Sequence, residues 1–312
     1  MSASATRFRP SGRHLALVGP TASGKSSLAL DLARSRTDLE IVTVDSMQVY
    51  RGMDIGTAKP SAAEQLEIRH HLIDIVDADD DYTVSRFQAD CREVLESIES
   101  RGNRAILVGG TGLYFQAITD DLEIPGQFPE VRTQLESDPD TVGLHRRLHE
   151  LDPVAAARMD SANRRRVIRA LEVVLGSGRP FSSFGPGIDA YPTAPFPIVG
   201  LDMSRDVLAQ RIADRYDDQF LDGFVDEVCV LLDRPGGLSR TARQALGYRE
   251  LIDHFENGTP LEEAKTNAVA RTRRFARRQL RWFGRDPRIT WIPTDGVSTE
   301  IALASMTELL GD

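Results

Sequence analysis

The chain has 312 residues, of which 41% are hydrophobic and 27% charged, as is ordinary for a globular protein with a core of its own. Its formal net charge of −9 argues against a general nucleic-acid coat protein, because phosphate binding needs clustered Lys and Arg. No apolar run approaches the roughly 18 residues of a membrane span, and residues 1–10 lack the apolar stretch of a signal peptide. Cys91 and Cys229 form no CxxC or His/Cys cluster, so we expect neither a disulfide scaffold nor a zinc site. We therefore expect a cytoplasmic protein with no membrane contact.

The first part of the chain alternates short β-branched runs with helical patterns. Strands are predicted over 14–18, 40–44 and 104–108, with helical patterns after the first strand to about residue 34 and over 84–98. Such alternation is typical of βαβ units, which form a parallel sheet covered by helices on both faces. The sequence therefore predicts an α/β fold.

The character of the sequence changes near residue 121. Prolines at 125, 129 and 139 interrupt the chain, helical patterns follow over 142–151, 153–159 and 163–175, and a Gly/Pro/Ser-rich stretch covers 176–195. A further buried strand is predicted over 196–202 and another over 289–292, with helices between them. We predict a core formed by 11–120 and 196–312, and a helical insert domain over 121–195.

A glycine-rich motif follows the first predicted strand and opens a helix. It fits the pattern G-x-x-x-x-G-K-[ST], in which backbone N–H groups surround a diphosphate, the lysine neutralises its charge and the hydroxyl can bind Mg²⁺. We therefore predict a P-loop NTPase-like core, with Ser26 as the metal ligand. The phosphate-binding residues are Gly19, Pro20, Thr21, Ala22, Ser23, Gly24, Lys25 and Ser26.

A phosphate loop does not specify the reaction, so the reaction has to be inferred from the residues at the ends of the other strands. Asp45 directly follows the second predicted strand, which we expect beside the strand of the phosphate loop. Three interpretations of Asp45 are open: a general base, a Mg²⁺ ligand, or an Asx-turn or helix cap. Asp202 ends the strand over 196–202, where a helix cap is favoured over metal support.

Six segments together resemble the tRNA dimethylallyltransferase family, also called isopentenyl-diphosphate:tRNA transferases. The run DSMQVYRGMDIGTAKP (45–60) is the most specific of them, and the likeness extends from about residue 14 to 292. The other five are GPTASGKS (19–26), HHLID (70–74), VGGTGLY (108–114), RRRVIRALEV (164–173) and RQALGYREL (243–251).

The resemblance implies the substrates and the reaction. The enzyme would transfer the dimethylallyl group from dimethylallyl diphosphate to N6 of the adenosine 3′-adjacent to the anticodon, position 37, in tRNAs that read codons starting with U. The phosphate loop would hold the diphosphate with Mg²⁺, and the anticodon stem-loop would present the adenine. We expect Asp45 and Thr111 to be catalytic, and the active protein to be a monomer.

The resemblance also implies where tRNA binds. The segments concerned are the start of the 45–60 run, the insert, and the residues after 240; position 132 is from sequence alone only an exposed arginine. The tRNA-binding residues expected from the resemblance are Asp45, Ser46, Met47, Gln48, Arg132, Arg165, Arg166, Val167, Ile168, Arg169, Arg243, Gln244 and Arg249. Arg274 and Arg278 are expected to bind tRNA on a separate ground, the arginine stripe of the last long helix.

The last long helix carries an arginine stripe that can be argued without the family. A capping box with proline at the first helical position predicts that the helix begins at Thr259-Pro260. On a helical wheel Ala276, Leu280 and Phe283 share one face, and arginines occupy the opposite face. Residues 271–288 contain eight arginines and one acid, a local charge of +7. Exposed helix faces ordinarily mix signs, so the stripe favours phosphate binding over a merely solvated surface.

Two other functions compete with the prenyltransferase. A P-loop kinase of a small molecule or nucleotide is the main alternative, because the strand and helix over 196–212 suit such enzymes. A nucleotide-switched binding module would need an acidic pair on a neighbouring strand, and the third strand instead runs into Gly109-Gly110-Thr111-Gly112. A kinase needs neither the arginine stripe nor the 45–60 run.

Overall fold

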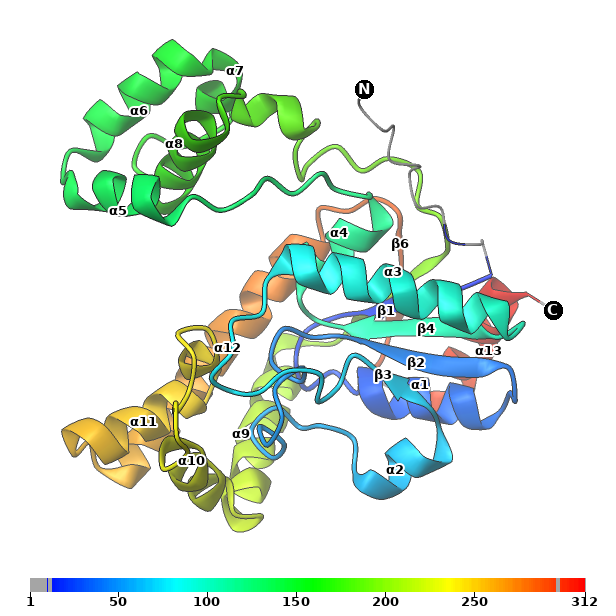
Figure 1. Cartoon of the computed structure of the whole chain (residues 1–312). Helices are drawn as coiled ribbons and strands as arrows, with labels where there is room; N and C mark the ends of the chain where they lie inside the picture. Colours follow the sequence, from blue (N-terminus) through cyan, green and yellow to red (C-terminus); the bar gives the residue numbers. More distant parts are fainter. Residues whose placement is uncertain (1–9, 11–12, 296–297, 312) are drawn as a thin grey trace. The chain divides into compact units, whose positions relative to one another are not determined.

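The computed structural model describes residues 10, 13–295 and 298–311 and divides the chain into two compact units (Figure 1). The larger unit comprises residues 1–120 and 191–312, and the smaller comprises 121–190. The insert was predicted to extend to 195, but residues 191–195 belong to the larger unit. The reason is Arg288, which donates to the carbonyl of Pro192 at 2.6 Å and lies over the ring of Tyr191.

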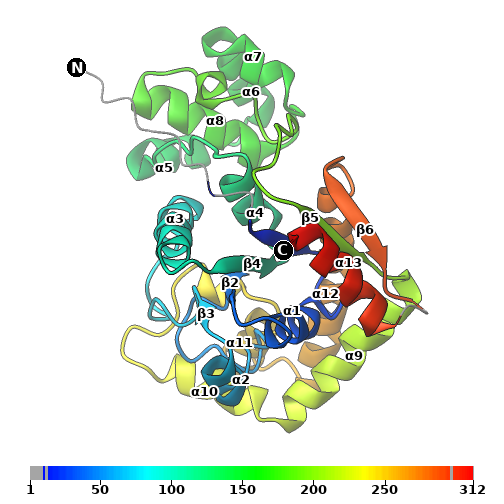
Figure 2. The ribbon, with the colours of Figure 1, turned by 90° about the vertical axis from the view of Figure 1, so that its right-hand side faces the viewer.

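A single parallel sheet of six strands organises the larger unit and confirms the predicted α/β class (Figure 2). The strand order is β3-β2-β4-β1-β5-β6, and each neighbouring pair is parallel. The strands are β1 (Leu15–Val18), β2 (Leu39–Val44), β3 (His70–His71), β4 (Arg104–Gly109), β5 (Ile198–Asp202) and β6 (Ile289–Pro293).

Helices cover both faces of the sheet, because alternate strand residues point to opposite sides. Leu15 and Leu17 belong to the core formed with α1 and α13, whereas Ala16 and Val18 belong to the larger core on the other face. The helices of this unit are α1 (Lys25–Arg34), α2 (Ala62–Glu67), α3 (Val84–Ser100), α4 (Gly112–Thr119), α9 (Arg205–Leu221), α10 (Phe224–Leu232), α11 (Tyr248–Asn257), α12 (Leu261–Phe283) and α13 (Thr299–Leu310).

Three local predictions were wrong. Strand β2 does not lie beside β1, because β4 pairs with both of them and separates them. Thr259 does not cap α12, since its hydroxyl donates to Asp253 and Pro260 is the N-cap residue. The N-cap residue of α9 is Ser204 rather than Asp202.

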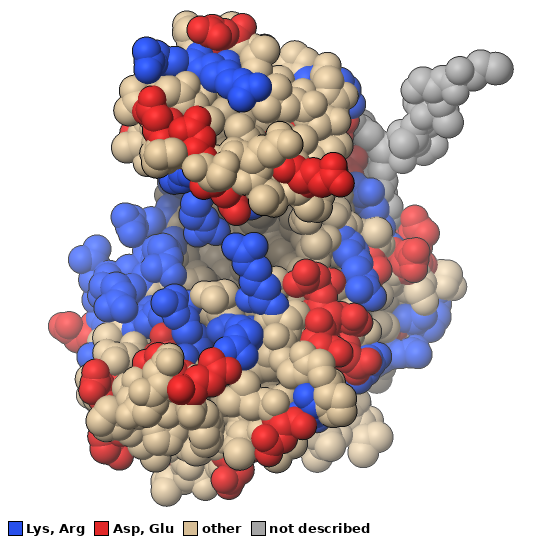
Figure 3. Space-filling view, turned by 60° about the vertical axis from the view of Figure 1, so that its left-hand side comes forward, with Lys and Arg blue, Asp and Glu red and all other residues tan. Residues whose placement is uncertain are grey.

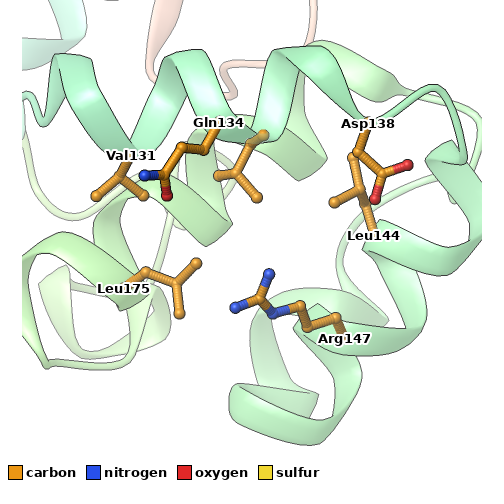
Figure 4. Close-up of a pocket in the computed structure, with 7 residues that line it drawn as sticks. Val131, Gln134, Asp138, Leu144, Arg147 and Leu175 are labelled. Carbon is orange, nitrogen blue, oxygen red and sulfur yellow. The ribbon is translucent and has the colours of Figure 1, made fainter.

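The smaller unit is a helical cluster around its own core, as predicted for the insert. Its helices are α5 (Pro129–Ser137), α6 (Thr141–Leu151), α7 (Pro153–Ala157) and α8 (Arg164–Ser177). Helix α5 was not predicted, because Pro129 suggested a chain break; it occupies the first helical position, where proline is tolerated. Side chains from α5, α6 and α8 surround a cavity of about 100 Å³ (Figure 4).

Within the described part of the chain, no helix combines the length and the apolar character that crossing a bilayer would require.

Candidate active site

The phosphate loop connects β1 to α1, as the motif predicts. Gly24 is the N-cap residue of α1 with a φ of 89°, a left-handed conformation that favours glycine. No side chain caps this helix and no acidic residue lies in its first turn. The first N–H groups of α1 are therefore available to an anion, which the helix dipole also attracts.

Lys25 lies in the loop in the position that the motif requires. Its side chain is buried and its Nζ donates to the carbonyl of Pro20 at 2.5 Å. Burial lowers the pKa of Lys25 to about 7, an effect that the carboxylate of Asp45 opposes and the guanidinium of Arg215 reinforces. A bound diphosphate would supply the negative charge that stabilises the ammonium form of Lys25.

Two arginines of α9 face the phosphate loop, and neither was predicted from the sequence as a site residue. Arg215 donates to Thr21 Oγ1 at 3.2 Å, and the guanidinium of Arg211 lies beside Gly24. Burial lowers the pKa of Arg215, against opposing effects from Tyr216 and Asp45. The two arginines are four residues apart and so share one helix face. One sequence feature could have indicated these arginines: α9 follows β5, and β5 ends at the same edge of the sheet as the phosphate loop.

Asp45 lies at the carboxyl end of β2, near both cations of the site. Its Oδ1 accepts hydrogen bonds from the backbone N–H of Met47 at 2.8 Å and of Gln48 at 3.4 Å. This is the Asx-turn, one of the three interpretations that the sequence leaves open for Asp45. Among the hydrogen bonds of the described residues, Oδ2 takes no part, so the turn leaves one carboxylate oxygen for a substrate proton.

The turn after β4 brings Thr111 to the same edge of the sheet. The Thr111 hydroxyl accepts a hydrogen bond from the backbone N–H of Ser46 at 3.3 Å, which joins this turn to the segment that follows β2. The glycines of this turn allow neighbouring groups to approach its backbone closely. A Cβ at Gly109 would lie 2.0 Å from the carbonyl oxygen of Val44, and one at Gly112 would lie 2.4 Å from the Trp282 ring.

The 45–60 segment is held by α10 and α11, which explains its specific sequence. Glu227 accepts hydrogen bonds from the backbone N–H groups of Asp54, Ile55 and Gly56 at 2.7–3.2 Å, and from the hydroxyl of Tyr248 at 2.5 Å. A Cβ at Gly56 would collide with the rings of Phe224 and Tyr248.

The two ends of this segment are also tied together. Gln48 Nε2 donates to the carbonyls of Thr57 and Ala58, and the buried ammonium group of Lys59 contacts Asp54, Asp74 and the carbonyl of Tyr50. The conformation that presents Asp45 therefore depends on contacts made by the far end of the segment.

Replacing Glu227 by alanine should lower the free energy of unfolding by about 2–3 kcal/mol, because the buried Tyr248 hydroxyl and three backbone N–H groups, two of them partly buried, lose their acceptor. Urea denaturation measures this change. Tyr248→Phe is the matched control: it leaves the three backbone hydrogen bonds in place and should cost only about 1 kcal/mol. A Glu227→Ala protein as stable as the wild type would contradict the clamping role.

The arginine stripe of α12 is narrower than the sequence suggested. Arg271 pairs with Glu250, Arg273 donates to the carbonyl of Ala209, and Arg288 pairs with Asp120 and Asp286. The exposed members are Arg274, Arg277, Arg278, Arg281 and Arg285; we call these five the arginine ridge. Figure 3 shows Lys and Arg side chains gathered along one side of the larger unit.

The charges of the ridge crowd one another. Partial burial lowers the pKa of Arg278, and the like charges of Arg271, Arg274 and Arg281 lower it further. An anion bound here would relieve this repulsion. Ala276 and Phe283 are buried on the opposite face of α12, which confirms the predicted packing face.

The insert places its predicted tRNA contacts unequally. Val167 and Ile168 are buried in the core of the unit, so the expectation that these side chains contact tRNA is corrected. Arg169 donates to the carbonyls of Pro125 and Gly126, and Arg132 pairs with Glu136, so both have structural partners. The exposed candidates of this segment are Arg165 and Arg166.

Among the predicted tRNA-binding residues around α11, too, some have partners within the protein and others are exposed. Arg243 pairs with Glu256 at 2.5 Å, whereas Gln244 and Arg249 are exposed. Ser46, Met47 and Gln48 are partly buried beside Asp45 at the carboxyl edge of the sheet.

A family model and several known proteins are similar to this chain over most of its length. The family model for IPP transferase matches residues 48–286. A relative from Bifidobacterium longum subsp. infantis, named tRNA dimethylallyltransferase, is 47% identical over 287 residues that cover 90% of this chain and 86% of the relative. A relative of the same name from a Nocardioides species is 47% identical, with coverage of 90% and 91%.

Solved structures agree with these relatives. The full-length tRNA isopentenylpyrophosphate transferase from Bacillus halodurans is 37% identical with a TM-score of 0.69, covering 95% of this chain and 94% of that one. A eukaryotic dimethylallyltransferase acting on tRNA is 26% identical with a TM-score of 0.76, covering 93% and 77%. With its phosphate loop, its strand-end carboxylate and these relatives, the chain belongs to the IPP transferase family.

Proposed function

We propose that this protein is a tRNA prenyltransferase that moves the dimethylallyl group from dimethylallyl diphosphate to N6 of adenosine 37, next to the anticodon, in tRNAs that read codons starting with U. The observation that carries the proposal is the meeting of Lys25, Arg215 and Asp45 at one sheet edge, in a chain of this family. All of these groups come from one chain, so the proposed active species is a monomer. Action on tRNA would place it in the cytoplasm.

The cations act on the leaving group. As the C–O bond of dimethylallyl diphosphate breaks, the diphosphate gains negative charge, which Lys25, Arg215 and the N–H groups of α1 stabilise. These groups come from α1, α9 and the loop between β1 and α1, so they are fixed before the substrate binds. Fixed charges require little reorganisation during the reaction.

The carboxylate acts on the nucleophile. The exocyclic amine of adenine is weakly nucleophilic because its lone pair is delocalised into the ring. A hydrogen bond from this amine to Asp45 Oδ2 would orient it, and the carboxylate would accept its proton as the C–N bond forms. The Asx-turn holds Oδ1 during this step. Thr111 lies one loop away as a further polar contact near the reacting atoms.

The donor set suits Mg²⁺ bound largely through the substrate. Ser26 is exposed in the first turn of α1, and within residues 10, 13–295 and 298–311 no three His, Cys, Asp or Glu residues converge as a metal site. Mg²⁺ commonly uses few protein ligands and keeps water and phosphate oxygens. We propose that the Ser26 hydroxyl is its ligand. When bound, the ion would neutralise charge on the departing diphosphate.

The arginine ridge, Gln244 and Arg249 would bind tRNA on the larger unit, with Arg165 and Arg166 contributing from the insert. Phosphate contacts by arginine position an RNA, and the target adenine must leave its stack to reach a catalytic carboxylate. The chain is acidic overall, so these exposed arginines favour a limited docking surface.

One assay tests the proposed function against the kinase alternative. Protein is incubated with radiolabelled dimethylallyl diphosphate, Mg²⁺ and an unmodified tRNA that reads a codon starting with U. We expect label in the tRNA, and none when adenosine 37 is replaced by guanosine. Transfer of phosphate from ATP to a small molecule without labelling of tRNA would overturn the proposal.

A further inference from the structure

Gln279 is a buried polar residue on the packing face of α12. It is 6% exposed and lies between Ala276 and Phe283, which are 1% and 2% exposed. A buried amide is costly unless both its donor and its acceptor are hydrogen-bonded. Gln279 is therefore expected to have hydrogen-bond partners, as the other buried polar residue of this face, Thr272, has in the hydroxyl of Tyr216.

Its two partners are backbone groups of two different loops. Gln279 Oε1 accepts from the N–H of Thr21 at 2.9 Å, and its Nε2 donates to the carbonyl of Gly110 at 2.9 Å. Thr21 belongs to the phosphate loop after β1, and Gly110 begins the turn after β4, the strand paired with β1. One side-chain amide thus bridges two loops whose strands are neighbours.

Each of these loops leads to a different part of the site. Thr21 Oγ1 accepts from Arg215, which faces the phosphate loop. Gly110 precedes Thr111, whose hydroxyl accepts from the N–H of Ser46, next to Asp45. The bridge also excludes side chains, because a Cβ at Gly110 would lie 2.2 Å from Gln279 Nε2. Gln279 thereby spans the diphosphate side and the base side of the site.

The same helix carries four of the five arginines of the ridge, and Arg285 follows its C-terminal end. Arg278 precedes Gln279 in the chain and is exposed, so adjacent residues of α12 point toward solvent and toward the loops. We propose that Gln279 is a positioning residue that fixes the phosphate loop and the turn after β4 in one relative geometry, and anchors both to the helix that carries the ridge. This role rests on the proposed function.

The test compares Gln279→Leu with Gln88→Leu. Gln88 is also 6% exposed and donates to a backbone carbonyl, that of Ala117, but it lies on α3. Inorganic diphosphate with Mg²⁺ is the binding probe, measured by calorimetry without tRNA. We expect Gln279→Leu to raise its Kd about tenfold, since one loop loses its fixed conformation. Gln88→Leu should lower the Tm and leave this Kd unchanged.

Kinetics add a second readout. The kcat of prenyl transfer should fall about tenfold in Gln279→Leu, because the diphosphate and base sides lose their alignment, while the KM for tRNA stays near the wild-type value. The binding measurement needs no turnover, so failure of the positioning role and failure of the proposed reaction are distinguishable.

A second variant covers the case in which Gln279→Leu does not fold. Gln279→Met nearly keeps the length and volume of the side chain and adds no charge, but it loses both the acceptor for Thr21 and the donor to Gly110. It should also raise the Kd for diphosphate. A wild-type Kd in either folded variant, with only the Tm lowered, would overturn the positioning role.

Discussion

Replacing Asp45 by asparagine should lower the kcat of prenyl transfer by roughly 10²–10⁴, the usual contribution of a general base. Asparagine keeps a side-chain oxygen that can accept from the N–H of Met47 and Gln48, so the Asx-turn should persist. The loss would then report the missing proton acceptor rather than a rearranged loop. Single-turnover measurement with saturating tRNA and dimethylallyl diphosphate isolates the chemical step.

Two controls separate the base from its surroundings. Asp77→Asn removes one negative charge from an exposed residue that pairs with Arg51, and it should leave kcat unchanged. Asp45→Ala removes the turn acceptor as well, so it should lower both kcat and the Tm. An Asp45→Asn enzyme with wild-type kcat would mean that another group accepts the proton.

The parts of the site that could be predicted from sequence are local. The phosphate loop, the carboxylate of Asp45 and the threonine after β4 each follow directly from a strand, and the edge where parallel strands end is common to all of them. The order of the strands could not be predicted in the same way. It depends on where each crossover connection brings the chain back into the sheet, and β4 is inserted between β2 and β1.

The parts that could not be predicted are distant in sequence. Arg215 reaches Thr21 across 194 residues, and Gln279 reaches it across 258. On α9 an arginine resembles any charged surface residue until the fold shows what it faces. Gln279 offered a weak signal, as a polar residue on a mostly apolar helix face. Distance in sequence also explains the error about the arginine stripe. The helical spacing of the arginines could be predicted, but the ion pair between Arg288 and the distant Asp120 could not.

The arginine ridge makes the second strong prediction. Replacing Arg274 and Arg278 together by glutamine should weaken tRNA binding and reduce the salt dependence of its Kd. Each lost phosphate contact lowers the slope of log Kd against log salt by about 0.7–0.9, so the pair should lower it by about 1.5. Filter binding of an unmodified tRNA over a series of salt concentrations measures the slope.

Net charge alone must be separated from position. The control variant, Arg34→Gln with Arg69→Gln, also removes two positive charges. Arg34 ends α1 and Arg69 directly precedes β3, so both lie at the opposite edge of the sheet from the phosphate loop. This control should leave the slope as it is in the wild type, because these arginines are remote from the ridge. Equal slopes in the ridge variant and the wild type would instead identify the ridge as a solvated surface. A lower slope in the ridge variant alone would mean that an acidic protein binds RNA through locally concentrated charge, on the helix whose other face holds the phosphate loop.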